Sequence, residues 1–342
     1  MMTSIKTVEE LEERLSRPTV ADVSAMADLD GDLLILGAGG KMGPSLAALA
    51  RRATDRAKVR KRIIAVSRFA DDNARRQLSS QNIETIACDL LEPGELAKLP
   101  DVKNVIFMAA RKFGTTGSAH LTWAMNTYLP GLVAERFHKS RIVAFSTGNV
   151  YPLRPVHKGG ATESDPVDPQ GEYAQSALGR ERMFEYGSHK WGTPVTILRL
   201  NYAVEFRYGV LADIGQAVFE RRPIDLRMGF VNVIWQGDAN SVCLRSFEHC
   251  QAPPLILNLT GPETLSVRHV AGEFGQHFGV DPVFELEESP TALLSDASKS
   301  LSLFGCPEVK PSEVVEWIAD WLRSDGPMLN KPTHFATRDG KF

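Results

Sequence analysis

The sequence predicts an α/β fold in which a doubly wound parallel sheet carries a smaller, interleaved C-terminal domain. First, the apolar run Leu33–Leu36 leads directly into glycines at positions 37, 39, 40 and 43. Second, apolar segments typical of buried strands recur along the chain with helix-forming segments between them, which favours parallel strands joined by right-handed crossovers. Third, 342 residues with 43% hydrophobic residues are enough to bury a large core.

The expected elements follow in order. Two short helices within residues 7–27, interrupted by Pro18, precede the first strand. Residues 152–170 are rich in Pro, Gly and Asp, and are expected to form a loop over the site. Two later apolar stretches, Phe230–Trp235 and Leu255–Leu259, are expected to return to the main sheet. The predicted strands before them are Leu33–Leu36, Ile63–Ser67, Ile83–Cys88, Val105–Ala109, Ile142–Ser146 and Val195–Asn201.

The glycine-rich turn predicts the class of ligand. Its spacing fits both G-x-x-G-x-x-G (37, 40, 43) and G-x-G-x-x-x-G (37, 39, 43). Between a buried strand and a helix, such a turn lets a diphosphate lie against backbone N–H groups at the positive end of the helix. The alternative is a structural turn that needs glycine only for positive φ. The residues assigned to this Rossmann-type dinucleotide site are Gly37, Gly39, Gly40, Lys41, Met42 and Gly43.

Four parts of the chain are expected from these elements. Residues 1–28 form an N-terminal helical extension, and residues 29–202 form the NAD(P)-binding domain, to which residues 230–260 return. Residues 203–229 and 261–330 form the substrate-binding domain, and residues 331–342 form a polar, extended tail.

The composition limits the class of protein. A net charge of −3 argues against a general binder of nucleic acid or of membrane surfaces. The four cysteines are scattered without a C-x-x-C pair, and the eight histidines have no ligand spacing, so neither a disulfide framework nor a metal site is expected. There is no secretory signal, and no apolar run approaches the ~18 residues of a membrane helix. We expect a soluble cytoplasmic protein.

The end of the second predicted strand bears on the choice of cofactor. A protein that binds NAD usually has an acidic residue here for the adenosine ribose, but this chain has Ser67 followed by Arg68. An arginine would accommodate a 2′-phosphate, so the sequence favours NADP over NAD. The alternative is that Arg68 is a solvated surface residue. Asp89, after the third strand, could accept from the adenine amino group or could cap a helix.

Several motifs occur in a familiar order, and the ordered set resembles the extended short-chain dehydrogenase/reductases, the family of nucleotide-sugar epimerases and dehydratases. The resemblance covers about residues 30–320. The motifs are the glycine turn, Asp89-Leu90, Phe107–Ala110, Asn126, Phe145–Tyr151, Gly171–Tyr173, Arg199–Asn201, Asn258, Leu265–Arg268 and Leu303–Gly305.

The resemblance implies roles for individual residues. Tyr173 matches the catalytic tyrosine, and Thr147 matches the residue that hydrogen-bonds the substrate oxygen. The alternatives are a packing tyrosine and a strand-end turn residue. The resemblance also implies a homodimer through the helices that carry Asn126 and Tyr173. The residues implied to contact the cofactor are Gly37, Gly40, Gly43, Asp89, Leu90, Ala109, Ala110 and Tyr173.

The chain departs from the family pattern four residues after Tyr173, where Ala177 replaces the expected lysine. An ammonium there favours the ionised form of a phenol whose ordinary pKa is near ~10, and it also hydrogen-bonds the nicotinamide ribose. Arg180 shares the helix face of Tyr173 about 10 Å further along the axis, so it could supply the charge. The alternative is a surface arginine, or one paired with Glu181. Other candidate cations are Arg111, Lys112 and Lys158.

The substrate side also departs from the pattern of nucleotide-sugar enzymes. Arg227 precedes Phe230, but Asp238 follows at a longer spacing, so a smaller sugar or a sugar acid is an open alternative. Arg221 and Arg222 could hold a phosphate or a carboxylate.

The resemblance and the motifs lead to two hypotheses from different classes. The first is an NAD(P)-dependent oxidoreductase or epimerase that transfers hydride at a carbinol or carbonyl carbon of a carbohydrate-like substrate. The second is a non-catalytic dinucleotide-binding redox sensor or regulatory protein, which Ala177 favours.

Overall fold

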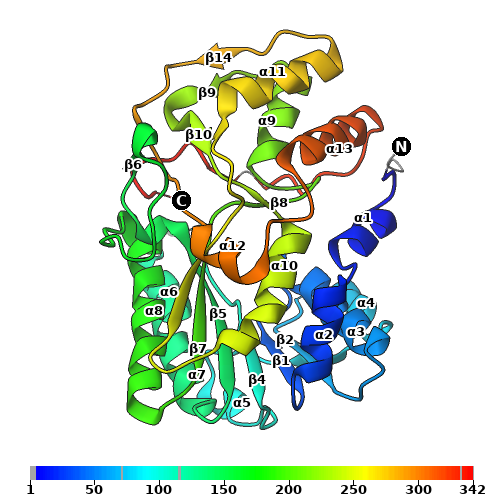
Figure 1. Cartoon of the computed structure of the whole chain (residues 1–342), viewed down its shortest axis with the longest axis vertical. Helices are drawn as coiled ribbons and strands as arrows, with labels where there is room; N and C mark the ends of the chain where they lie inside the picture. The colour runs from blue at the N-terminus through cyan, green and yellow to red at the C-terminus, as the bar shows by residue number, and fades with distance from the viewer. Residues whose placement is uncertain (1–4, 71, 115–116, 332, 342) are drawn as a thin grey trace.

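A seven-stranded parallel sheet forms the centre of the computed structural model, which describes residues 5–70, 72–114, 117–331 and 333–341 (Figure 1). The strand order is β12-β7-β5-β4-β1-β2-β3, and every pairing is parallel. The predicted doubly wound sheet is therefore confirmed. Its strands are β1 (Leu33–Leu36), β2 (Ile63–Ser67), β3 (Glu84–Ala87), β4 (Asn104–Phe107), β5 (Arg141–Thr147), β7 (Val195–Leu200) and β12 (Leu255–Leu259).

The central strands are apolar throughout because both faces of the sheet are covered. In β1, Leu33 and Ile35 pack into one hydrophobic cluster, and Leu34 and Leu36 pack into another on the opposite face. The first face is covered by α2 (Val20–Asp28), α3 (Gly43–Arg56) and α10 (Gln236–Arg245). The second is covered by α5 (Pro93–Leu96), α7 (Leu129–Arg136) and α8 (Gly171–Trp191).

The remaining helices complete the outer layers. The two short helices predicted on either side of Pro18 are present as α1 (Val8–Leu15) and α2, and each begins with a capping box. A π-helical turn, Ala124–Tyr128, lies between α6 (Ala119–Trp123) and α7. The others are α4 (Asp72–Ser79), α9 (Val210–Phe219), α11 (Val267–Phe278), α12 (Ser298–Phe304) and α13 (Pro311–Arg323).

A third hydrophobic cluster, called the upper cluster, lies above the carboxyl edge of the sheet, among α9, α11 and α13 (upper part of Figure 1). Phe206 is fully buried at its centre, with its ring 5.6–5.7 Å from those of Trp235, Trp317 and Trp321. Four two-stranded sheets border this cluster. They are β8 (Ala203–Val204) with β11 (Ile234–Trp235), β10 (Phe230–Val231) with β13 (Leu265–Ser266), β9 (Ile224–Asp225) with β14 (Phe284–Glu285), and β6 (Arg154–Pro155) with β15 (Thr291–Ala292).

One prediction about the later chain is confirmed and one is wrong. Leu255–Leu259 returns to the main sheet as β12, but Phe230–Trp235 does not, because it forms β10 and β11 of the small sheets. In this segment Val231, Val233 and Trp235 pack into the upper cluster. Ile234 packs into the cluster on the face of the sheet that contains Leu33 and Ile35. The apolar run therefore joins two cores, a role that hydrophobicity alone does not distinguish from that of a central strand.

None of the helices in the described part of the chain combines the length and the apolar character needed to cross a lipid bilayer.

The aromatic centre of the upper cluster predicts a large loss of stability on truncation. Phe206→Ala should lower the free energy of unfolding by about 3–5 kcal/mol, because it leaves a cavity among three indole rings. Phe219→Ala is the matched control, since this side chain is 45% exposed, and it should cost less than half as much. Urea unfolding of both variants measures the difference, and equal losses would contradict this description of the cluster.

Candidate functional site

The turn after β1 is held against β2 and β4 by its backbone. The N–H groups of Gly37 and Ala38 both donate to the Val66 carbonyl, at 2.9 and 3.0 Å. Gly37 has a φ of +91°, and a Cβ there would lie 2.6 Å from the Ala109 nitrogen. A Cβ at Gly43 would lie 2.2 Å from the Ala38 carbonyl oxygen. These two glycines are therefore required by the packing of the protein itself.

Gly40 is different, because a Cβ at this position would approach no described atom closer than 3.4 Å. Gly39 and Gly40 are both exposed, and they lie just before the N-terminus of α3. A bare backbone at the positive end of a helix suits a diphosphate. The turn therefore fits the phosphate part of a dinucleotide, and Gly40 is the glycine that the protein's own packing does not explain.

The residues predicted to contact the adenosine lie at the ends of β2 and β3. Ser67 is the last residue of β2 and lies next to Gly39. A Cβ added to Gly39 would be 2.4 Å from the Ser67 Oγ. Arg68, the next residue, is exposed. Asp89 Oδ1 accepts from Leu91 N (3.1 Å), and Leu90 is buried. Asp89 thus closes a local turn and does not cap α5, whose cap residue is Glu92. Its contact with an adenine stays a prediction.

A cavity of about 330 Å³ opens at the carboxyl edge of β4, β5 and β7. It brings together Gly40, Lys41, Met42, Ala110, Thr147 and Tyr173 of the predicted site. Gly37, Gly39, Gly43, Ser67, Arg68, Asp89, Leu90 and Ala109 lie outside its lining. The other lining residues are Met108, Lys112, Phe113, Phe145, Ser146, Asn149, Arg180, Leu200, Asn201, Tyr202, Ala203, Tyr208, Gly209, Val210 and Thr333.

Thr147 and Tyr173 enter the cavity from neighbouring elements. Thr147 ends β5, and its Oγ1 accepts from the backbone N (3.2 Å) and the side-chain Nδ2 (3.0 Å) of Asn149. Because both bonds are accepted, its hydroxyl proton is still available for donation. Tyr173 lies in the first turn of α8 and is 8% exposed.

Asn126 fixes the segment after β4 to α8. Its Oδ1 accepts from Arg111 N (2.8 Å), and its Nδ2 donates to Arg111 O (2.9 Å) and to Ser176 Oγ (3.0 Å). Asn126 is fully buried in the π-helical turn. It therefore joins the backbone next to Lys112 to the part of α8 that carries Tyr173.

The cavity is lined by three cations, Lys41, Lys112 and Arg180, and by no carboxylate among the described residues. Burial lowers the pKa of the Lys112 ammonium to about 8, and this group lies 5.9 Å from the centre of the Tyr173 ring. Lys41 Nζ lies 4.1 Å from the centre of the Tyr208 ring. Such a lining favours an anionic ligand.

Arg180 is buried, with 3% of its surface exposed. Its Nη1 donates to the Phe145 carbonyl (2.9 Å), whereas Nε and Nη2 have no hydrogen-bond partner among the residues that the structure describes. The interpretation as a surface arginine, or one paired with Glu181, is therefore wrong. Glu181 is fully buried and binds Arg199 instead, with an Nη2–Oε2 distance of 2.7 Å.

The Glu181–Arg199 ion pair belongs to a buried network beneath the cavity. Ser146 Oγ donates to Glu181 Oε1 (2.6 Å), and Arg199 Nη1 donates to the Tyr151 hydroxyl (2.6 Å). That hydroxyl donates to Asn258 Oδ1 on β12 (2.8 Å). The network joins β5, β7, β12 and α8, and so fixes the edge from which Thr147 and Tyr173 project.

The C-terminal segment adds a residue that the sequence did not indicate. Thr333 N and Oγ1 both donate to Asp213 Oδ2 (2.9 and 2.6 Å), and Lys112 Nζ donates to the Thr333 carbonyl (3.4 Å). Thr333 is buried and lines the cavity. The segment was predicted as a polar, extended tail, and no pattern in its sequence signals this contact.

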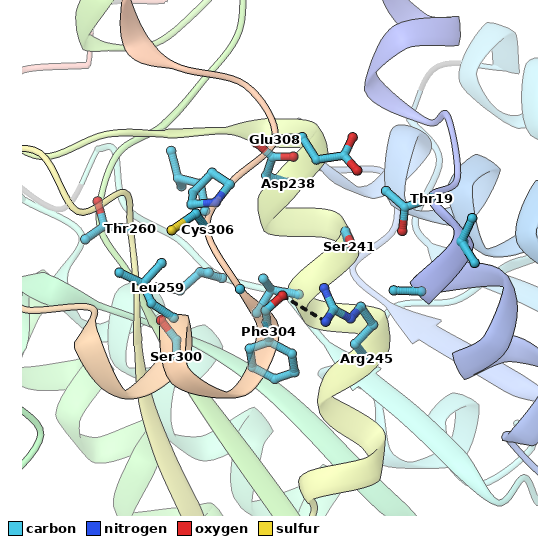
Figure 2. Close-up of a pocket in the computed structure, with 17 residues that line it drawn as sticks. Thr19, Asp238, Ser241, Arg245, Leu259, Thr260, Ser300, Phe304, Cys306 and Glu308 are labelled. Atoms are coloured by element: carbon cyan, nitrogen blue, oxygen red, sulfur yellow. Dashed lines mark hydrogen bonds between the residues drawn. The ribbon is translucent and has the colours of Figure 1, made fainter.

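Arg227 and Asp238, considered on the substrate side, lie outside the cavity. Arg227 pairs with Asp225 (2.7 Å). Asp238 lies in a separate hollow bordered by α2, α10 and the segment after α12. Burial there raises the pKa of Asp238 to about 6, and its Oδ2 accepts a hydrogen bond from Val309 N (3.1 Å). Figure 2 shows this hollow, with Arg245 donating to the Phe304 carbonyl (2.9 Å). The two residues therefore do not form one binding site.

The other candidate cations are also outside the lining. Lys158 is an exposed residue of the loop that carries β6, and Arg111 Nη2 donates to Gly114 O (3.0 Å). Arg222 pairs with Glu220 on the surface. No group of three or more His, Cys, Asp or Glu side chains in the described ranges is arranged to hold a metal ion.

The model of the NAD dependent epimerase/dehydratase family matches residues 33–204, about half of the chain. No curated protein matches the chain by sequence. Similar solved structures include UDP-glucuronic acid 4-epimerase from Bacillus cereus in complex with UDP-glucuronic acid and NAD (17% identity, 85% of this chain and 99% of that chain, TM-score 0.70). Another is dTDP-glucose 4,6-dehydratase from Streptomyces venezuelae with NAD bound (17% identity, 86% and 97%, TM-score 0.73). At these identities the likeness shows the shared fold.

The two kinds of glycine in the turn predict different effects of adding a methyl group. Gly40→Ala should melt within about 2 °C of the wild type but bind reduced dinucleotide about 10-fold or more weakly, because its Cβ would stand between the backbone and the diphosphate. Gly43→Ala should instead lose about 1–3 kcal/mol of stability through overpacking against the Ala38 carbonyl. Thermal melting and nucleotide-fluorescence titration separate the two effects. Unchanged binding by Gly40→Ala would show that Gly40 does not face the ligand.

Proposed function

Since the chain belongs to the NAD-dependent epimerase/dehydratase family, we propose that it is an NAD(P)-dependent oxidoreductase or epimerase acting on a sugar, a sugar acid or a nucleotide sugar. The observation that carries the proposal is the cavity in which Thr147 and Tyr173 lie together beside the bare backbone of Gly40. The reaction would interconvert a carbinol and a carbonyl carbon.

The proposed mechanism gives each residue a task. The nicotinamide, when bound, supplies the hydride acceptor or donor. As the substrate alcohol gives up its hydride, its hydroxyl proton would pass to the ionised oxygen of Tyr173 and a carbonyl would form; the reverse reaction returns both. Thr147 would donate its hydroxyl proton to the substrate oxygen and so orient it. Met108, Phe113, Phe145 and Leu200 supply apolar walls that limit access of water.

The three cations of the lining support an acidic or phosphorylated substrate. Lys41, from the turn, would contact the diphosphate of the dinucleotide, and Lys112 would contact the substrate. The division into a dinucleotide-binding domain at residues 29–202 and a substrate-binding domain at residues 203–229 and 261–330 is part of the same proposal. Its support is that Tyr208, Gly209 and Val210 line this cavity together with Gly40, Lys41 and Met42 of the turn.

The choice of dinucleotide is a separate part of the proposal. Arg68 after β2 supports NADP, while several structural neighbours are described in complex with NAD, which does not support that preference. A homodimer is proposed from exposed apolar residues on the outer helices α6 and α8 and on the π-helical turn, namely Leu121, Trp123, Tyr128 and Tyr186. A cytoplasmic location stays a prediction.

A second candidate function is a dinucleotide-binding redox sensor without catalysis, which the alanine at position 177 favours. A panel of sugars, sugar acids and nucleotide sugars, assayed by the absorbance of reduced cofactor and by the stereochemistry of the products, separates the two. Turnover of any member supports the enzyme. Tight dinucleotide binding with no turnover supports the sensor.

The proposed proton transfer predicts the effect of removing one hydroxyl. Tyr173→Phe should lower kcat by about 10²–10⁴-fold, the contribution expected of general acid–base catalysis, and should change dinucleotide affinity little. Tyr186→Phe, on the exposed face of the same helix, is the matched control and should retain wild-type kcat. Steady-state kinetics on a substrate found in the panel measures both. Wild-type turnover by Tyr173→Phe would rule out this tyrosine as the acid–base group.

A further inference from the structure

The buried charge of Arg180 is not fully compensated by the residues that the structure describes. Its guanidinium is buried and makes one hydrogen bond, from Nη1 to the Phe145 carbonyl, while Nε and Nη2 have none from any described residue. A buried charge with unsatisfied donors is costly unless a partner accepts them. Arg180 lines the same cavity as Tyr173 and Thr147, so a ligand or an ionised group in that cavity is the candidate for the missing partner.

We propose that Arg180 takes the place of the lysine that Ala177 lacks, holding the ionised oxygen of Tyr173 and donating to a hydroxyl of the nicotinamide ribose. This inference rests on the proposed function, since it assigns the charge on which the proton transfer by Tyr173 depends.

The geometry of α8 explains how a residue seven positions away can serve. Side chains on a helix lean toward its N-terminus, so Arg180 extends back toward the end that carries Tyr173. Ala177 is fully buried in a hydrophobic cluster with Val150, Tyr151 and Ala161, and it does not line the cavity. The proposed cation therefore lies about one helical turn further along α8 than position 177, and the long arginine side chain spans part of the additional distance to Tyr173.

Glu181 does not neutralise Arg180, although it is the next residue. Both of its carboxylate oxygens accept hydrogen bonds from Arg199, and one of them also accepts from Ser146. Burial lowers the pKa of the Arg180 guanidinium, and an ionised Tyr173 and Glu181 act in the opposite direction. The charge of Arg180 is therefore available to the cavity.

Lys112 is the rival cation. Its ammonium lies toward the ring of Tyr173, at 5.9 Å from the ring centre, and it donates to the Thr333 carbonyl. Burial brings its pKa to about 8, so its charge is lost as the pH rises through 8, which is still below the ordinary pKa of a phenol near ~10. A guanidinium keeps its charge over this range. The other charged or titratable groups around Arg180 are Lys41, Glu181, Arg199, Tyr202 and Tyr208.

The test uses neutral and conservative substitutions in the full chain. Arg180→Gln keeps an N–H donor for the Phe145 carbonyl but removes the charge, and Arg180→Lys restores the charge. Arg182→Gln is the matched control, because Arg182 lies on the outer face of α8 and pairs with Glu185. The first readout is the affinity for NADH and NADPH by nucleotide fluorescence, with melting temperature as the check on folding. The second is the pH dependence of kcat on a substrate from the panel.

We expect Arg180→Gln to bind reduced dinucleotide about 10-fold or more weakly and to need a higher pH for half-maximal kcat. Arg180→Lys should recover part of both effects, and Arg182→Gln should match the wild type. Wild-type affinity and pH profile in Arg180→Gln would overturn the proposal, as would a shifted profile in Lys112→Gln alone. If the wild type binds no dinucleotide, the proposed function fails and the assignment of Arg180 fails with it. If the wild type binds and turns over but Arg180→Gln matches it, only the assignment of Arg180 fails.

Discussion

The buried ion pair between Glu181 and Arg199 is the constraint on which the rest of the site depends. It joins α8 to β7, and through Ser146, Tyr151 and Asn258 it reaches β5 and β12. A buried pair is tolerated when hydrogen bonds satisfy both partners, as they do in this network. Its consequence for function is indirect. Because Glu181 is engaged by this pair, neighbouring Arg180 is left buried without an ion-pair partner among the described residues, in the lining of the cavity that holds Tyr173.

The glycine turn combines structural and binding requirements in seven residues. Gly37 and Gly43 are needed because the backbone of Ala109 and of Ala38 approaches them too closely for a side chain. Gly40 has space for a methyl group, so its bare backbone is explained by something outside the protein. The sequence allowed two glycine spacings, one with Gly39 and one with Gly40 as the middle glycine. The structure favours Gly40 as the glycine that faces the ligand, since Gly39 lies against Ser67.

Much of the fold could be predicted because its signals are local. The buried strands, the turn after β1 and the helices around Pro18 all follow from apolar periodicity and from capping residues. The predictions were wrong or incomplete where the position of a segment depends on contacts with residues far away in the sequence. Phe230–Trp235 has the composition of a buried strand but joins two cores, and Thr333 reaches the cavity through Asp213, which lies 120 residues earlier. Arg180 could be identified as a candidate from helical spacing. The sequence does not show that Glu181 pairs with Arg199, and this pairing leaves the buried Arg180 without a carboxylate partner among the described residues.

Calorimetric titration of the purified chain with NAD⁺, NADH, NADP⁺ and NADPH tests the central claim most directly, because the site, the proposed chemistry and the role of Arg180 all require a bound dinucleotide. We expect saturable heat for at least one of the four, with one site per chain. An absence of saturable binding for all four would contradict the account, and the cavity beside Tyr173 would then need a different ligand.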